Sequence, residues 1–137
     1  MKKVLCILLP IFLLIGCTGC AAVISYPSGT AVRICYDREH VSFDLELSQE
    51  EANVVLSVLN GKQRDLDMTV TGAACGFGRE QSFVINGHVY CLAQDMCPVL
   101  WEEGTENYYL ISTQEREKLE ELFIAHGAII ILHTSSA

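Results

Sequence analysis

The sequence has little positive charge. Nine lysines and arginines stand against seventeen aspartates and glutamates, and the formal net charge is −8 over 137 residues. Binding to DNA or RNA depends on clustered lysine and arginine side chains, which neutralise the phosphate backbone. An acidic chain repels that backbone, so the composition argues against a nucleic-acid partner.

Sequence motifs that identify common enzymes and cofactor sites are also missing. After residue 30 there is no C-x-x-C pair of the kind used in thiol redox chemistry. The glycines at 72, 76 and 78 match neither phosphate-loop pattern, GxxxxGK or GxGxxG, and the acidic stretch 102–106 lacks the D-x-D-x-D-G order of a calcium loop. We therefore expect no catalytic residues, no metal ion and no cofactor, and an enzyme is the less favoured class.

The sequence also has no apolar run of the roughly 20 residues that a transmembrane helix needs. Its longest run is residues 4–15, which follow Lys2 and Lys3 and precede several small residues. A positive start, a short apolar core and small residues, in this order, are typical of an export signal. The chain is therefore predicted to leave the cytoplasm.

The end of the apolar run, Leu14-Ile15-Gly16-Cys17, resembles the lipobox of bacterial lipoproteins. The resemblance implies that the signal peptide, residues 1–16, is removed and that diacylglycerol, with palmitate-type chains, is attached to the sulfur of Cys17. The protein would then be held by lipid on the cell membrane, facing outside the cytoplasm. Two or three acyl chains, at about 0.8 kcal/mol per buried CH₂, make a stable anchor. Cleavage before Cys20 and an uncleaved signal remain as alternatives, and both keep the chain tethered there.

Residues 17–30 are expected to form the lipid anchor and a short connector, and residues 31–137 a single α+β domain. Half of the residues are hydrophobic, enough for one modest core. Helices are predicted after Ser48 and Ser112, because each serine is followed three residues later by a glutamate in a capping box. We expect a mainly antiparallel sheet of about five to seven strands with two amphipathic helices on one face. Strands are predicted at residues 31–36, 41–47, 66–71, 82–85, 88–93, 108–111 and 128–132, with a loop at 99–107.

The clearest hairpin signal is Asn86-Gly87, a favoured type I′ turn sequence between two apolar runs. In this register Ile85 faces His88 and Phe83 faces Tyr90. One face of the hairpin is then aromatic, and the other carries small residues. We expect the helices to pack on the small face, which holds Ser82, Val84, Val89, Cys91 and Ala93.

The cysteines are interpreted as structural. Exported proteins meet oxidising conditions, in which a disulfide typically contributes 2 to 4 kcal/mol. Cys75 and Cys97 flank the hairpin and should emerge at the same end of it, so they are the first disulfide candidates. Cys35 with Cys91 is the second candidate pair. A metal site at His88, Cys91 and Cys97 is not expected, because residues three apart on a strand point to opposite faces.

Binding candidates lie in the loops around Cys75 and Trp101, and include Phe77 and Arg79. Large aromatic side chains in loops often anchor interfaces. The sequence thus favours a small, non-enzymatic binding or interaction domain with a protein partner at the cell surface or in the periplasm. The alternatives are a thiol-based redox protein or other small envelope enzyme, and a structural component of the envelope.

Overall fold

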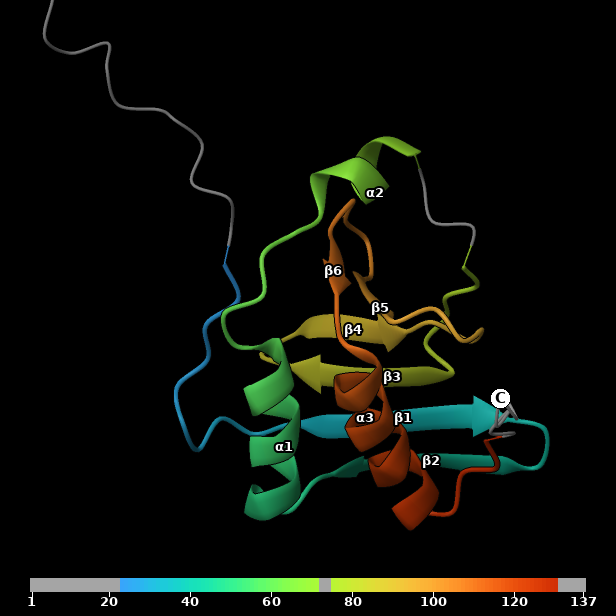
Figure 1. The fold of residues 1–137 in the computed structure, drawn as a ribbon. Coiled ribbons are helices and arrows are strands. Elements are labelled where there is room, and N and C mark those ends of the chain that lie inside the picture. Colours follow the sequence, from blue (N-terminus) through green and yellow to red (C-terminus); the bar gives the residue numbers. More distant parts are fainter. Residues whose placement is uncertain (1–22, 72–74, 131–137) are drawn as a thin grey trace, which may run out of the picture.

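The protein has an α+β fold built on one open, antiparallel sheet (Figure 1). The computed structural model describes residues 23–71 and 75–130. Within these ranges the sheet has six strands in the order β2-β1-β3-β4-β5-β6, and α1 and α3 lie across one face of it. The elements are β1 Arg33–Arg38, β2 Val41–Glu46, α1 Gln49–Leu59, α2 Leu66–Thr71, β3 Gln81–Ile85, β4 His88–Leu92, β5 Val99–Glu102, β6 Tyr108–Leu110 and α3 Thr113–Ala125.

The capping boxes begin both long helices as predicted. The amide of Glu51 donates to the hydroxyl of Ser48, and the carboxylate of Glu51 accepts from the Ser48 amide at 3.0 Å. The same reciprocal pair joins Ser112 and Glu115 at the start of α3. These bonds satisfy amides that have no partner within the helix, so the sequence sets the start of each helix locally.

The hairpin of β3 and β4 is confirmed in the predicted register. Ile85 pairs with His88, Val84 with Val89, and Phe83 with Tyr90. The turn residues Asn86 and Gly87 both have positive φ, 49° and 83°, as a type I′ turn requires.

The helices, however, pack on the aromatic face of this hairpin, so the expectation that they cover the small face is wrong. The rings of Phe83 on β3 and Phe123 on α3 lie 4.9 Å apart, and both side chains are fully buried. Large side chains bury more apolar area between sheet and helix than small ones do, and the hydrophobic effect therefore favours this face. The core also includes Ile24, within the expected connector, which is 7% exposed.

Three predicted segments differ from the structure. Residues 66–71 were expected as a strand but form α2. Asp65 caps the first turn of this helix, because its Oδ1 accepts a hydrogen bond of 2.9 Å from the Met68 amide. The expected loop at 99–107 begins with strand β5, so the connection between β5 and β6 is shorter than predicted and spans only residues 103–107. Residues 128–130 are not in a strand, and the remainder of that predicted segment, 131–132, lies outside the described residues.

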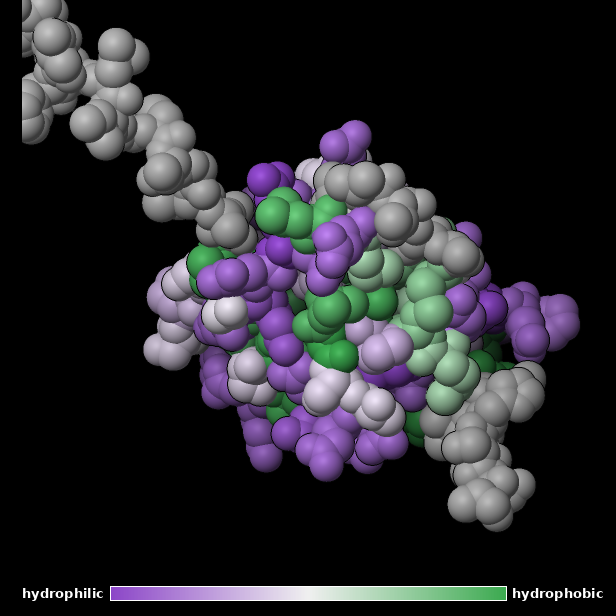
Figure 2. Space-filling view, turned by 45° about the horizontal axis from the view of Figure 1, so that its top comes forward, coloured by the Kyte–Doolittle hydropathy of each residue, from purple (hydrophilic) through white to green (hydrophobic). Residues whose placement is uncertain are grey.

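Hydrophilic side chains form most of the surface seen in Figure 2, and apolar side chains gather in a band that runs down from its upper part. No helix in residues 23–71 and 75–130 is long and apolar enough to cross a membrane.

Candidate functional site

The sheet face opposite the helices is divided into a covered part and an open part. Residues 75–80 cover the part formed by β4, β5 and β6. There the ring of Phe77 lies 6.0 Å from that of Trp101 and 5.8 Å from that of Tyr108. Trp101 is thus a half-buried residue of β5 beneath Phe77, and its indole nitrogen donates to the Thr105 carbonyl at 3.0 Å. Two of the predicted binding residues, Phe77 and Trp101, therefore contact each other and hold the loop onto the sheet.

Arg79, the third binding candidate, lies between the covered and open parts. Its guanidinium forms an ion pair with Glu103 and its side chain is 68% exposed. Its carbonyl accepts a hydrogen bond of 3.0 Å from the hydroxyl of Ser82. The arginine is therefore accessible, while its backbone is fixed to β3.

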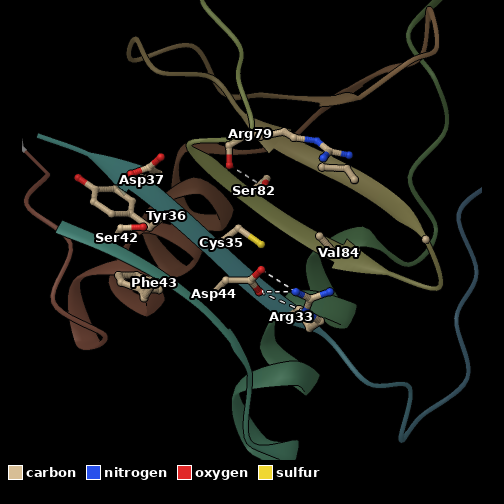
Figure 3. Close-up of a pocket in the computed structure, with 12 residues that line it drawn as sticks. Arg33, Cys35, Tyr36, Asp37, Ser42, Phe43, Asp44, Arg79, Ser82 and Val84 are labelled. Carbon is tan, nitrogen blue, oxygen red and sulfur yellow. Dashed lines mark hydrogen bonds and ion pairs between the residues drawn. The ribbon is translucent and has the colours of Figure 1, made fainter.

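The open part of the face, over β2, β1 and β3, is hollowed, and we call this hollow the β1 hollow (Figure 3). Its volume is about 390 Å³. Among its lining residues, Arg33 and Asp44 form a bidentate ion pair with a shortest distance of 2.6 Å, and both side chains are half-exposed. Polar and charged residues dominate its lining, namely Arg33, Cys35, Asp37, Ser42, Asp44, Arg79 and Ser82.

The thiol of Cys35 lies in the β1 hollow between the side chains of Asp44 and Ser82 (Figure 3). Burial raises the pKa of this thiol, and the neighbouring Asp44 carboxylate raises it further. Deprotonation to the nucleophilic thiolate is thereby disfavoured. Cys35 is a polarisable lining residue and not an activated nucleophile.

The predicted pairing of Cys35 with Cys91 is incompatible with the order of the strands. Cys35 on β1 pairs with Ser82 on β3, and Ser82 pairs with Cys91 on β4, so a whole strand lies between the two cysteines. Two strand spacings separate their Cα atoms by roughly 10 Å, whereas a disulfide needs less than about 7 Å. Both are free thiols in the structure. The sequence placed both on strands but could not give the order of those strands.

Cys75 and Cys97, by contrast, are brought together at one end of the hairpin. Together with Asp95 they form a group whose sulfur and carboxylate oxygen atoms all lie within 4.8 Å of one another, which we call the cysteine cluster. Both cysteines are free thiols here, and the disulfide stays a prediction. Asp95 was not expected at this site. A hydrogen bond of 3.1 Å from the Cys97 amide to its Oδ1 holds the carboxylate beside the two sulfurs.

Ionisation is strongly perturbed in the cysteine cluster. Hydrogen bonding to Cys75 and then to Asp95 raises the pKa of Cys97 to about 12. For Asp95, desolvation acts to raise the pKa, but hydrogen bonds from Cys97 outweigh it, and the pKa lies below its usual value. At neutral pH the free cluster thus holds a carboxylate beside a protonated thiol, which differs from the low-pKa cysteine of thiol oxidoreductases.

Arg116 of α3 supports the loop that carries the cluster. Its Nη1 donates to the Cys97 carbonyl at 2.6 Å and its Nη2 to the Ala93 carbonyl at 2.9 Å. The same guanidinium lies 2.7 Å from Glu120, and both side chains are buried. The sequence pattern, two opposite charges four residues apart on a helix, predicts a pair on the wet side of α3. That expectation is wrong, because residues 93–97 lie over this part of α3 and exclude water from it.

A second polar group surrounds the buried carboxylate of Glu102 on β5. Asn107 and Tyr109 each donate to Oε2 at 3.0 Å, and His88 Nδ1 lies 2.7 Å from Oε1. Desolvation acts to raise the pKa of Glu102, but the hydrogen bonds outweigh it and the pKa is lowered. His88 is thus paired with a carboxylate. No sequence signal identified Glu102, which stands in the acidic stretch 102–106 and cannot be told apart by its neighbours.

The structure therefore joins two pairs of the predicted site residues, Cys75 with Cys97 and Phe77 with Trp101, while Cys17 lies outside the described residues. The first pair lies at the end of the hairpin, and the second holds residues 75–80 onto β5. Comparisons with models of protein families, with curated proteins and with solved structures found no match.

Proposed function

We propose that this chain is a lipoprotein held on the outer side of a bacterial cell membrane through Cys17, and that its domain is a non-enzymatic binding module for a protein partner. The location rests on the lipobox-like sequence at residues 14–17 and on the short apolar run before it. The binding role rests on the geometry of the sheet.

The observation that carries the binding role is the β1 hollow. The helices cover one sheet face and residues 75–80 cover part of the other, but the area over β2 and β1 remains accessible (Figure 3). It offers both charge signs at fixed positions, because Arg33 and Asp44 hold each other in a bidentate pair. A surface of mixed sign suits a protein partner better than a polyanion, because charge complementarity sets register and specificity in protein interfaces.

The strand at the edge of the hollow adds a second kind of contact. β2 is the last strand of the sheet and pairs only with β1 in the described part of the chain. An edge strand has free amide and carbonyl groups along its outer side and can accept an extended segment of another protein. The hollow and this edge together form a continuous candidate interface.

Chemistry in the hollow is disfavoured by the state of its groups. The only thiol among its lining residues, Cys35, has a raised pKa, and no histidine lines the hollow. A nucleophile needs an adjacent base or a lowered pKa to react at neutral pH. The hollow therefore suits recognition better than catalysis.

A photo-reactive amino acid placed at Ser42, which is exposed at the hollow, tests the binding role in intact cells. We expect one dominant cross-linked protein that disappears when Val84→Arg fills the hollow. The matched control carries the same amino acid at Glu121, on the exposed side of α3, and should not yield this product. Identical products from both positions, or a product insensitive to Val84→Arg, would count against the hollow as the interface.

Lipid attachment is tested separately. Globomycin, which blocks the lipoprotein signal peptidase, should cause a larger precursor to accumulate, and Cys17→Ser should release the protein from the membrane fraction or leave it unprocessed. Normal processing and membrane retention of Cys17→Ser would contradict the anchor. That result would leave the cross-linking experiment unaffected.

A thiol-based redox protein is the second candidate, because Cys75 and Cys97 are neighbours. The raised pKa of Cys97 disfavours it, since the attacking group in disulfide exchange is the thiolate. Quantifying alkylation rates of the reduced protein at neutral pH separates the two. Binding predicts slow reaction at Cys97, and rapid reaction there would favour the redox function.

A further inference from the structure

We propose that Cys75, Asp95 and Cys97 form a binding site for a soft or borderline divalent cation, for which Zn²⁺ is the best match. The proposal is independent of the partner-binding role of the β1 hollow. It rests on the kinds of ligand atoms, on their separations and on the way the two loops that carry them are held.

The separations suit a tetrahedral ion. Two sulfurs and one carboxylate oxygen lie within 4.8 Å of one another. In a tetrahedral zinc site with Zn–S bonds of about 2.3 Å and Zn–O bonds of about 2.0–2.2 Å, neighbouring ligand atoms lie about 3.5–3.8 Å apart. Small side-chain rotations can close this difference, and the backbone does not need to move.

The ligand types select the class of ion. Two cysteine sulfurs are soft donors that prefer zinc and similar transition metals. Magnesium and calcium are hard ions that require oxygen ligands throughout. A set of two sulfurs with one carboxylate therefore excludes the latter two and favours Zn²⁺.

The loops that carry the ligands are held in place from outside the cysteine cluster. The amide of Gln94 donates to the Gly76 carbonyl at 2.8 Å, which joins the loop before β3 to the loop after β4. From the opposite side Arg116 donates to the carbonyl of Cys97 at 2.6 Å, and this arginine is only 4% exposed. Ligands on loops that hydrogen bonds already hold in place lose little freedom on binding, which favours affinity.

The charge balance also suits a divalent ion. Two thiolates and the Asp95 carboxylate carry three negative charges, and a divalent cation reduces them to one. The nearby Arg116 does not leave an uncompensated positive charge, because Glu120 pairs with it at 2.7 Å. Asp95 is exposed and both cysteines are half-buried, so the fourth position of a tetrahedral ion is open to water.

An ion at this position would join the loops at 75–80 and 93–98, which a Cys75–Cys97 disulfide would also do. The two states are mutually exclusive, because a disulfide sulfur has no thiolate to offer. Asp95 distinguishes them: a carboxylate close to both sulfurs adds a ligand to a metal site and contributes nothing to the disulfide bond itself.

The test uses the reduced full-length protein in detergent, with Co²⁺ as a spectroscopic probe and Zn²⁺ as its competitor. We expect one ion per chain, with the sulfur-to-cobalt charge-transfer band of a thiolate site and the visible bands of a tetrahedral ion. Zn²⁺ should displace the Co²⁺. Loss of a ligand in Cys97→Ser should lower affinity by more than about 100-fold, since even supporting residues of metal sites cost about 10–100-fold.

Two variants keep the test decisive if a cysteine variant fails to fold. Asp95→Asn changes an exposed side chain and should weaken binding at least about 10-fold, with the charge-transfer band retained. Cys35→Ser removes another half-buried thiol, distant from the cysteine cluster, and should leave stoichiometry and affinity unchanged. Absence of binding by the reduced wild type, equal losses in Cys35→Ser and Cys97→Ser, or full affinity in Asp95→Asn would overturn the proposal.

The state in cells decides whether the site is used. Protein extracted from envelopes under anaerobic conditions should contain about one zinc per chain in an untreated portion. In a second portion, denatured at once with a chelator and an alkylating agent, Cys75 and Cys97 should both be alkylated. A Cys75–Cys97 disulfide in this sample would overturn the proposal for the exported protein and would support the structural bridge in its place.

Discussion

Arg116 and Glu120 form an ion pair inside the protein, with Nη2 of the arginine 2.7 Å from Oε1 of the glutamate and with side chains 5% and 4% exposed. The arginine also donates to the carbonyls of Ala93 and Cys97. One buried side chain thereby connects α3 to the loop after β4.

Arg116→Met should lower the free energy of unfolding by about 3–5 kcal/mol, because it leaves the buried charge of Glu120 without a partner. Urea denaturation followed by circular dichroism measures the loss. Arg33→Met, which breaks the exposed pair with Asp44, is the matched control and should change stability little. Equal effects of the two substitutions would show that the pair in α3 is not desolvated.

Stability should depend on pH through Glu102. Its pKa is lower in the folded protein than in the unfolded chain, so its contribution is present above the unfolded value of about 4.3 and is lost as pH falls through the folded pKa. Glu102→Gln should reduce the free energy of unfolding at pH 7 by about 1–3 kcal/mol, and this difference from the wild type should shrink in acid. Denaturation at several pH values tests this, with the exposed Glu121→Gln as control. A difference that does not change with pH would contradict it.

The hairpin turn should favour glycine at position 87, where φ is 83°. Gly87→Ala should destabilise the protein by about 1 kcal/mol, because residues other than glycine are strained in this conformation. Gly76→Ala is the control: its φ is not in that region and an added Cβ would meet only the side chain of Gln94 at 3.6 Å. Thermal unfolding distinguishes the two, and comparable losses would show that the turn conformation is not the cause.

Phe77→Ala should uncover the single tryptophan. The Phe77 ring packs against Trp101 and Tyr108, and its loss should move the tryptophan emission to longer wavelength and cost about 1–2 kcal/mol. The control is Phe43→Ala on the helix side of the sheet, which should leave the emission unchanged. An unshifted spectrum in Phe77→Ala would mean that the loop does not cover β5 in solution.

Local signals predicted much of the fold. The caps at Ser48 and Ser112 and the turn at Asn86 involve residues within a few positions of one another, and each was confirmed. The error at 66–71 arose because a six-residue segment with alternating polarity fits a strand as well as a short helix, and the cap from Asp65 decides between them.

The candidate site was less predictable because it depends on contacts between distant segments. Cys75 and Cys97 could be placed together, since both flank one hairpin. The burial of Arg116 and the failure of the Cys35–Cys91 pairing follow from the order of strands and from the path of the loops, which sequence periodicity does not contain.

The cysteine cluster and the start of the described chain lie at opposite ends of the strands (Figure 1). Val23 pairs with Gln63 near the end at which β4 begins, whereas Asp95 and Cys97 follow the end at which β4 stops. Under the proposed lipid attachment at Cys17, the tether would join the domain at the end opposite the cysteine cluster, and a five-residue strand of about 17 Å separates these two ends. Ions and reductants arriving from the medium would reach this end without crossing the space between domain and bilayer.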